Sequence, residues 1–204
     1  MKLSISQKSI ILIVLVLIID QTSKIFIKLN FALGDHYDVF SWFQIFFIEN
    51  NGMAFGMEII GKLFLTLFRI IAVAGLAYFI HRLIKKGARQ GFILSISLLL
   101  AGAAGNIFDS LFYGILFSES TTSYVANFMP ETGGYAPFLY GKVVDMLYFP
   151  IIKGADGHTI FFSPVFNIAD SAITIAVAII LIFFRKELNE SLETKKHKNE
   201  NPKA

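Results

Sequence analysis

The chain has 204 residues, of which 55% are apolar and only 16% charged, and it contains no Cys. This composition excludes a disordered chain, is atypical of a soluble domain, and leaves no residue for a disulfide, a zinc–thiolate site or a cysteine nucleophile. The apolar composition therefore predicts an integral membrane protein. The formal net charge of +3 is small, and its placement along the chain is more informative than its size.

The first predicted membrane helix covers residues 10–29, since a bilayer is crossed by roughly 20 apolar residues. Its start resembles a secretory signal peptide, but no small-residue cleavage site follows, which favours a retained helix. Asp20 precedes Lys24 by four residues, the favourable order for an intrahelical ion pair. Counted from residue 10, Asp20 lies about 15 Å deep, near mid-membrane, so we predict that this pair is structural.

The first outer loop is expected at residues 30–61. Aromatic and β-branched side chains dominate residues 37–48, a composition that favours a strand lying at the level of the lipid headgroups. Asn50, Asn51 and Gly52 then predict a turn.

The second and third predicted helices cover residues 63–84 and 92–114. Arg69 in the former is expected to extend to the outer interface or to meet a phosphate. In the latter, Asn106 and Asp109 are three residues apart and share a helix face, about 26 Å above its start. The small residues just before them predict close helix packing.

The second outer loop, residues 115–163, contains Asp145, and the fourth predicted helix covers residues 164–184. Asn167 and Asp170 near its start are again three residues apart, so we expect both on one helix face. Asp109, Asp145 and Asp170 are therefore predicted at one level, the outer face of the membrane.

The orientation follows from Lys and Arg, which cluster in residues 81–90 and after residue 184. Both termini are therefore predicted to be cytoplasmic. The expected fold class is an all-α membrane bundle of four transmembrane helices, with a small β-rich extracytoplasmic subdomain formed by the two outer loops. Residues 1–186 would form this single domain, and residues 187–204 a charged, frayed cytoplasmic tail.

Two carboxyl groups that are forced together come to share a proton, so one can act as a base toward water while the other donates to a scissile carbonyl. This aspartic-protease chemistry needs neither a metal nor a thiol, and the four His residues offer no metal-site spacing. The alternative from the residues alone is a set of solvated acids at the interface.

Five stretches of the chain, in order, resemble the lipoprotein signal peptidase family, also called signal peptidase II. They are Asp20-Gln21-Thr22-Ser23-Lys24, Asn50-Asn51-Gly52-Met53-Ala54-Phe55-Gly56, Gly105-Asn106-Ile107-Phe108-Asp109, Val143-Val144-Asp145 and Phe166-Asn167-Ile168-Ala169-Asp170-Ser171. Together they span nearly the whole chain, which makes the resemblance specific.

The resemblance implies an aspartic endopeptidase of the bacterial inner membrane. It would remove the signal peptide of a diacylglyceryl-modified prolipoprotein, cutting just before the lipidated Cys, without a cofactor and with the bilayer as its surroundings. It implies a catalytic pair, Asp145 and Asp170, and a brace on the first helix, Asp20 and Lys24. The resemblance also implies a substrate groove that would bind globomycin-type inhibitors. The residues that line this groove would be Asn50, Gly52, Asn106, Asp109 and Asn167.

The chain departs from the family pattern at Ser110, where an Arg is usual, and at Met53, where a small residue is usual. A hydroxyl at position 110 cannot replace a bidentate cation. Insertions are also expected at about 117–140 and 148–162. These departures concern substrate contacts rather than the carboxyl pair.

The sequence leaves two alternatives to the enzyme: a small proton-coupled transporter or channel, and a non-catalytic assembly subunit. Intramembrane acids serve as proton relays, but a relay would have them staggered through the membrane. Here only Asp20 is expected to lie deep, so the enzyme is favoured.

Overall fold

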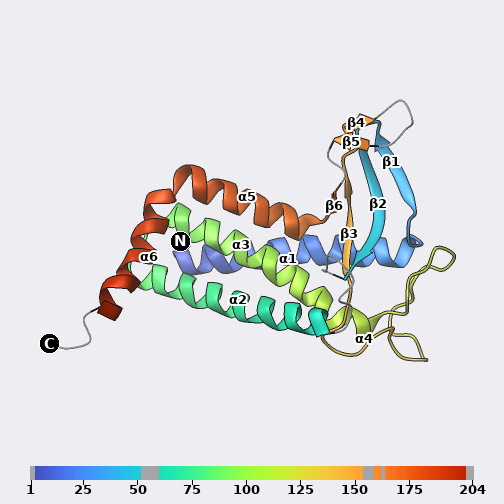
Figure 1. Cartoon of the computed structure of the whole chain (residues 1–204), viewed down its shortest axis with the longest axis horizontal. Coiled ribbons are helices and arrows are strands. Elements are labelled where there is room, and N and C mark those ends of the chain that lie inside the picture. Colours follow the sequence, from blue (N-terminus) through green and yellow to red (C-terminus); the bar gives the residue numbers. More distant parts are fainter. Residues whose placement is uncertain (1–2, 52–59, 154–158, 162–163, 201–204) are drawn as a thin grey trace.

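The computed structural model of the chain describes residues 3–51, 60–153, 159–161 and 164–200 (Figure 1). The helices in chain order are α1 (Ile5–Asn30), α2 (Ile60–Lys85), α3 (Gln90–Phe108), α4 (Gly114–Leu116), α5 (Ile168–Phe183) and α6 (Arg185–Glu200). A π-helical turn, η1 (Asp109–Tyr113), joins α3 to α4. The strands are β1 (His36–Phe40), β2 (Phe43–Asn50), β3 (Val143–Tyr148), β4 (Ile152–Lys153), β5 (Thr159–Phe161) and β6 (Val165–Phe166).

Within the described residues, three helical stretches are long and apolar enough to cross a membrane: α1, α2 and the stretch Gln90–Leu116. A fourth span is reached if α5 and α6, which meet at a bend of 90°, count as one broken segment. Large apolar side chains remain exposed along these helices, for example Ile11, Val14 and Ile18 on α1. Such a surface is suited to lipid rather than water.

The first helix begins at Ile5, five residues earlier than predicted, because Ser4 caps it. The N–H of Gln7 donates to Ser4 Oγ, and the N–H of Ser4 donates to Gln7 Oε1, which forms a capping box. Lys24, which pairs with Asp20, also pairs with Asp109, so the prediction that Asp20 lies apart from the other acids is wrong. The depth of Asp20 in the membrane stays a prediction.

Helix α3 lies at the centre of the bundle and packs against α1, α2 and α5 (Figure 1). The expected close packing at its small residues is found. A Cβ on Gly102 would lie 2.4 Å from the carbonyl oxygen of Ala169, and one on Gly105 would lie 2.6 Å from Asp20 Oδ2. Only glycine lets α1 and α5 approach α3 this closely.

An antiparallel sheet with strand order β1-β2-β3-β6 stands at one end of the helices (Figure 1). The prediction of strand within residues 37–48 is confirmed by β1 and β2. The predicted turn after them falls largely outside the described residues, although Asn50 itself is the last residue of β2. A separate two-stranded sheet, β4-β5, lies within the predicted insertion at 148–162.

The fourth helix begins at Ile168 rather than at residue 164. Val165 and Phe166 pair with β3 instead, and Asn167 is the N-cap of α5. The spacing of Asn167 and Asp170 predicts that both lie on one helix face. This is wrong, because Asn167 precedes the first turn of the helix. The reason is that an Asn side chain satisfies the first free N–H groups of a helix and so starts it.

The C-terminal tail also differs from the frayed end that was expected, since it forms helix α6 as far as Glu200. Phe184 at the bend is buried and contacts the ring of Phe92, with centroids 6.0 Å apart. A Cβ on Gly91 would lie 2.6 Å from the Phe184 ring. This buried ring holds the start of α6 against the beginning of α3.

Candidate active site

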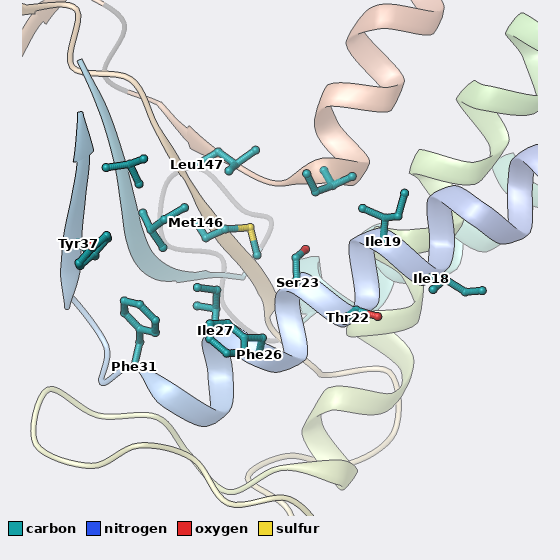
Figure 2. A pocket seen from close by; sticks show the side chains of 13 residues that line it. Ile18, Ile19, Thr22, Ser23, Phe26, Ile27, Phe31, Tyr37, Met146 and Leu147 are labelled. Carbon is teal, nitrogen blue, oxygen red and sulfur yellow. The ribbon is translucent and has the colours of Figure 1, made fainter. Parts of the chain in front are cut away.

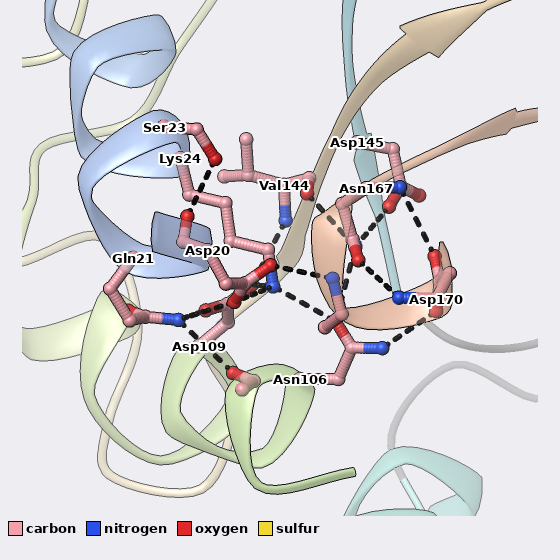
Figure 3. A network of polar contacts seen from close by, with 12 residues as sticks. Asp20, Gln21, Ser23, Lys24, Asn106, Asp109, Val144, Asp145, Asn167 and Asp170 are labelled. Carbon is pink, nitrogen blue, oxygen red and sulfur yellow. Dashed lines mark hydrogen bonds and ion pairs between the residues drawn. The ribbon is translucent and has the colours of Figure 1, made fainter. Parts of the chain in front are cut away.

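Asp145 lies in the middle of β3, where it pairs with Ile48 of β2, and only 3% of its surface is exposed. Asn167 Nδ2 donates to Asp145 Oδ1 at 2.7 Å, and the Asn50 side chain also hydrogen-bonds this carboxyl group. The sheet thus holds one of the two predicted catalytic carboxyl groups against the start of α5 (Figure 3).

Asp170 lies in the first turn of α5, where the helix dipole favours a negative charge. Its backbone N–H donates to Asn167 Oδ1 at 2.9 Å, and Asp170 Oδ2 accepts from the N–H of Asn167 at 3.3 Å. Asp170 Oδ1 also accepts from Asn106 Nδ2 at 2.7 Å. These hydrogen bonds fix the orientation of the Asp170 carboxyl group.

Asn167 joins the two acids. Its Oδ1 caps the helix that carries Asp170, while its Nδ2 donates to Asp145, and its side chain is fully buried. The same Nδ2 also donates to Asn106 Oδ1 at 3.1 Å, and Asn106 Nδ2 in turn donates to Asp170 Oδ1 (Figure 3). The predicted convergence of Asp145 and Asp170 is therefore present in the structure, around two Asn side chains.

Burial and the negative charge of Asp170 raise the pKa of Asp145 to about 7, against the opposing hydrogen bond from Asn167. A carboxyl group with this pKa holds a proton about half of the time at neutral pH. Together the pair offers one carboxyl group that can donate a proton and one that can accept it.

A buried ion network lies beside the pair. Lys24 Nζ is 3.0 Å from Asp20 Oδ2 and 2.8 Å from Asp109 Oδ2, and all three side chains have no exposed surface. The predicted Asp20–Lys24 pair is thus confirmed as a contact, but it is part of a larger cluster. Lys24 also donates to Asn106 Oδ1 at 2.9 Å, which connects the network to the site (Figure 3).

The same network fixes the two elements that carry the predicted catalytic acids. Asp20 Oδ1 accepts from the N–H of Ala169 in the first turn of α5 at 2.9 Å. Asp109 Oδ2 accepts from the N–H of Val144 in β3 at 3.3 Å. Asp109, predicted to line the substrate site, therefore contacts the backbone beside Asp145 and has no exposed side-chain surface.

Ser110, the departure from the family pattern, lies in the π-helical turn η1 and is buried. Its Oγ donates to the carbonyl oxygen of Asn106 at 3.1 Å. The guanidinium of Arg69 in α2 lies within electrostatic range of Asp170, Asp109 and Asp145. The expected contact of Arg69 with a phosphate stays a prediction.

Gly52 lies outside the described residues. Two side chains that the sequence reasoning missed belong to the network: Gln21 Nε2 donates to Asp109 Oδ1 at 2.9 Å, and the Tyr113 hydroxyl donates to Gln21 Oε1 at 3.1 Å. For Gln21, the available signal in the sequence was its position directly after Asp20. Within the described part of the chain, no group of three or more His, Cys, Asp or Glu residues could hold a metal ion.

Residues 12–186 match the family model described as signal peptidase (SPase) II. A lipoprotein signal peptidase of Porphyromonas gingivalis is 43% identical over 195 residues, which cover 91% of this chain and 86% of that protein. One of Amoebophilus asiaticus is 32% identical over 194 residues, covering 88% and 78%. A bacterial membrane enzyme solved in meso at 1.9 Å superposes with a TM-score of 0.60 and 30% identity, over 86% of this chain and 90% of that one.

Proposed function

The chain belongs to the signal peptidase II family, and from this we propose that it removes prolipoprotein signal peptides by aspartic-peptidase chemistry, with Asp145 and Asp170 as the catalytic pair. The observation that carries the proposal is that the buried carboxyl group of Asp145 in β3 and the partly buried one of Asp170 at the start of α5 meet around Asn167. The substrate class is a prolipoprotein whose Cys carries a diacylglyceryl group, with cleavage just before that Cys.

In the reaction, the pair shares one proton. Asp170 as carboxylate accepts a proton from water, whose oxygen attacks the scissile carbonyl carbon, while protonated Asp145 donates its proton to the carbonyl oxygen. As the C–N bond of the resulting diol breaks, the nitrogen of the lipidated Cys takes the proton from Asp170, and one diol hydroxyl returns its proton to Asp145. The signal peptide leaves as a carboxylic acid, the lipidated Cys keeps the free amine, and both carboxyl groups regain their starting protonation states.

Asn167 and Asn106 orient the carboxyl groups, whereas Asp20, Lys24 and Asp109 act as positioning residues through the backbones of Ala169 and Val144. Asn50 and Gly52 remain proposed substrate contacts, and Asp109 is proposed to position β3 rather than to contact the substrate. A globomycin-type inhibitor would occupy the same groove.

The membrane arrangement we propose has four spans, with α5 as the fourth, and both termini in the cytoplasm. The N-terminus, the connection from α2 to α3 and the start of α6 lie at the end of the bundle opposite the sheet (Figure 1). The Lys and Arg clusters predicted to be cytoplasmic belong to that end. The catalytic pair would then lie near the outer face.

A proton-coupled transporter is not favoured. Asp20, Asp109, Asp145 and Asp170 belong to one connected cluster rather than to a series of steps across the membrane. Such a cluster suits chemistry at one point.

The test is cleavage of a purified diacylglyceryl-modified precursor by Asp145→Asn and Asp170→Asn. The cleavage rate of each variant is expected to fall by about a hundredfold to ten-thousandfold, since that is what general acid–base catalysis contributes. Asp38→Asn is the matched control, because Asp38 is an exposed β1 residue bonded to Gln44, and it should keep full activity. Near-normal cleavage by a folded Asp145→Asn or Asp170→Asn variant would refute the assignment.

A further inference from the structure

A large apolar groove lies in the angle between α1 and the sheet, apart from the carboxyl pair (Figure 2). Its volume is about 730 Å³, within the range of about 300–1,000 Å³ for ligand sites. Its walls include Ile18, Thr22 and Phe26 of α1, Tyr37 of β1, Ile45 of β2 and Met146 of β3. We propose that it binds one acyl chain of a bilayer phospholipid from the leaflet nearest the sheet.

The groove is continuous with the lipid-facing surface of α1. Val14, Ile18, Thr22 and Phe26 follow one another at intervals of four residues, so they form one stripe along the helix. Ile18 and Phe26 are 57% and 59% exposed, and Val14, below the groove, is 47% exposed. A lipid chain lying along this stripe would enter the groove without leaving hydrocarbon.

The length of the groove fits one leaflet. From Ile18 to Ile27 its α1 wall rises about 14 Å, close to half of a hydrocarbon core of about 30 Å. Tyr37 lies at the far rim, beyond the end of α1, where an amphipathic ring suits the level of the ester and headgroup. The occupant is therefore a single chain running from Tyr37 toward Ile18.

A peptide is a poor occupant. An extended peptide would bring N–H and C=O groups that need partners in an apolar site. The lining offers few side-chain polar groups, the hydroxyls of Thr22, Ser23 and Tyr37, and Ser23 Oγ already donates to the carbonyl oxygen of Asp20 at 2.7 Å. An acyl chain has no such demand.

Neither member of the carboxyl pair lines the groove. The lining residues nearest to Asp145 and Asp170 along the chain are the apolar Met146 and Leu147 of β3 and Ile168 of α5, whereas Asp145 is directed at Asn167 (Figures 2 and 3). For this reason we assign the groove to a bilayer phospholipid rather than to the acyl chains of the substrate.

The test measures phospholipid that stays bound when the purified protein, loaded with palmitoyl-oleoyl phosphatidylglycerol, is exchanged into detergent, by native mass spectrometry. The wild type should retain one phospholipid, and Thr22→Trp, which places an indole in the groove, should lower its occupancy at least tenfold. Val14→Trp, on the same stripe but outside the groove, should retain the lipid as the wild type does. Circular dichroism would establish that both variants are folded.

A second measurement uses only the wild type and so does not depend on any variant. Phosphatidylglycerol with a diazirine in its acyl chain should label the groove residues of α1 and β3 preferentially over the exposed Phe64 and Phe68 of α2. Equal retention by both variants, or equal labelling of both surfaces, would overturn the proposal. One-for-one displacement of the lipid by the diacylglyceryl-modified precursor would overturn it too, since the groove would then belong to the substrate.

Discussion

At the scale of single residues, the carboxyl group of Asp145 combines deep burial with a negative neighbour. Its environment keeps it protonated at a pH where an ordinary Asp is ionised, and the pKa of about 7 compares with 3.8 for a free Asp side chain. Such a group weakens the fold when it is ionised, because the unfolded chain gives up the proton more easily. The acid that we propose to serve catalysis therefore costs stability.

The consequence can be measured with Asp145→Asn. Because the folded state binds the Asp145 proton more tightly than the unfolded state, wild-type stability falls as the pH rises from about 4 to about 7. The variant avoids this loss, so its Tm at pH 8 should exceed that of the wild type by roughly 5 °C or more, even though we expect it to be inactive. The difference should shrink at pH 5. A lower Tm than the wild type at pH 8 would show that Asp145 is ionised without cost.

At the scale of elements, the start of α5 is set by one side chain with two tasks. Asn167 caps the helix through Oδ1 and holds Asp145 through Nδ2. The cap ends β6, starts α5 and places Asp170 in the first helical turn. The position of the fourth helix and the geometry of the acids thus have the same cause.

Asn167→Asp separates the two tasks. An Asp caps a helix as well as Asn does but has no N–H to donate to Asp145, so the fold should persist while the cleavage rate falls by at least tenfold. Ser4→Ala is the matched control, since Ser4 caps α1 with the same capping box far from the site. It should cost about 1 kcal/mol of stability and no activity. Full activity of Asn167→Asp would mean that the amide donor is dispensable.

At the scale of the whole molecule, the buried cluster around Lys24 ties four elements together: α1, α3 with its π-helical turn, β3 and α5. One cation is shared by two carboxylates that have no exposed surface. Removing one partner of such a buried group leaves an uncompensated charge, which costs far more than the net gain from the intact pair.

We therefore expect Lys24→Met to destabilise the protein by about 3–5 kcal/mol, measured by thermal unfolding in detergent, and Asp20→Asn by clearly less, because Lys24 still pairs with Asp109. The triple variant with Lys24→Met, Asp20→Asn and Asp109→Asn contains no charge in the cluster and should recover part of the loss. If the triple variant were no more stable than Lys24→Met alone, packing rather than charge would explain the loss.

The orientation of the whole molecule is testable because the chain contains no Cys. Lys86→Cys, in the connection from α2 to α3, and Thr122→Cys, in the long excursion before the sheet, place one thiol each at exposed positions of opposite ends. In intact cells a membrane-impermeant maleimide should label Thr122→Cys, and Lys86→Cys only after lysis. The reverse pattern would invert the proposed topology.

Residues 117–140 show how the long connection before β3 is held in place. All of them are described, and they form an irregular excursion that is held to the rest of the chain by hydrogen bonds such as Leu33 N–H to the Thr121 carbonyl at 2.9 Å. Ser120 Oγ accepts from the buried Lys28 at 2.9 Å, and Lys28 also pairs with Glu49 of β2. The predicted insertion is thus attached to both α1 and the sheet.

The sequence by itself determined the apolar helices, the β-forming stretch after the first of them and the identity of the acids, because length, composition and short motifs are local properties. It also contained the capping signals of Ser4 and Asn167. They start the first helix five residues before, and the fourth helix four residues after, the predicted positions. Only the tertiary structure decided that Asp20 reaches Ala169, 149 positions away, and that Lys24 joins Asp109 and Asn106. The physical reason is that these contacts exist only because Gly102 and Gly105 let three helices approach closely, and neither spacing nor composition fixes how far separate helices slide along one another.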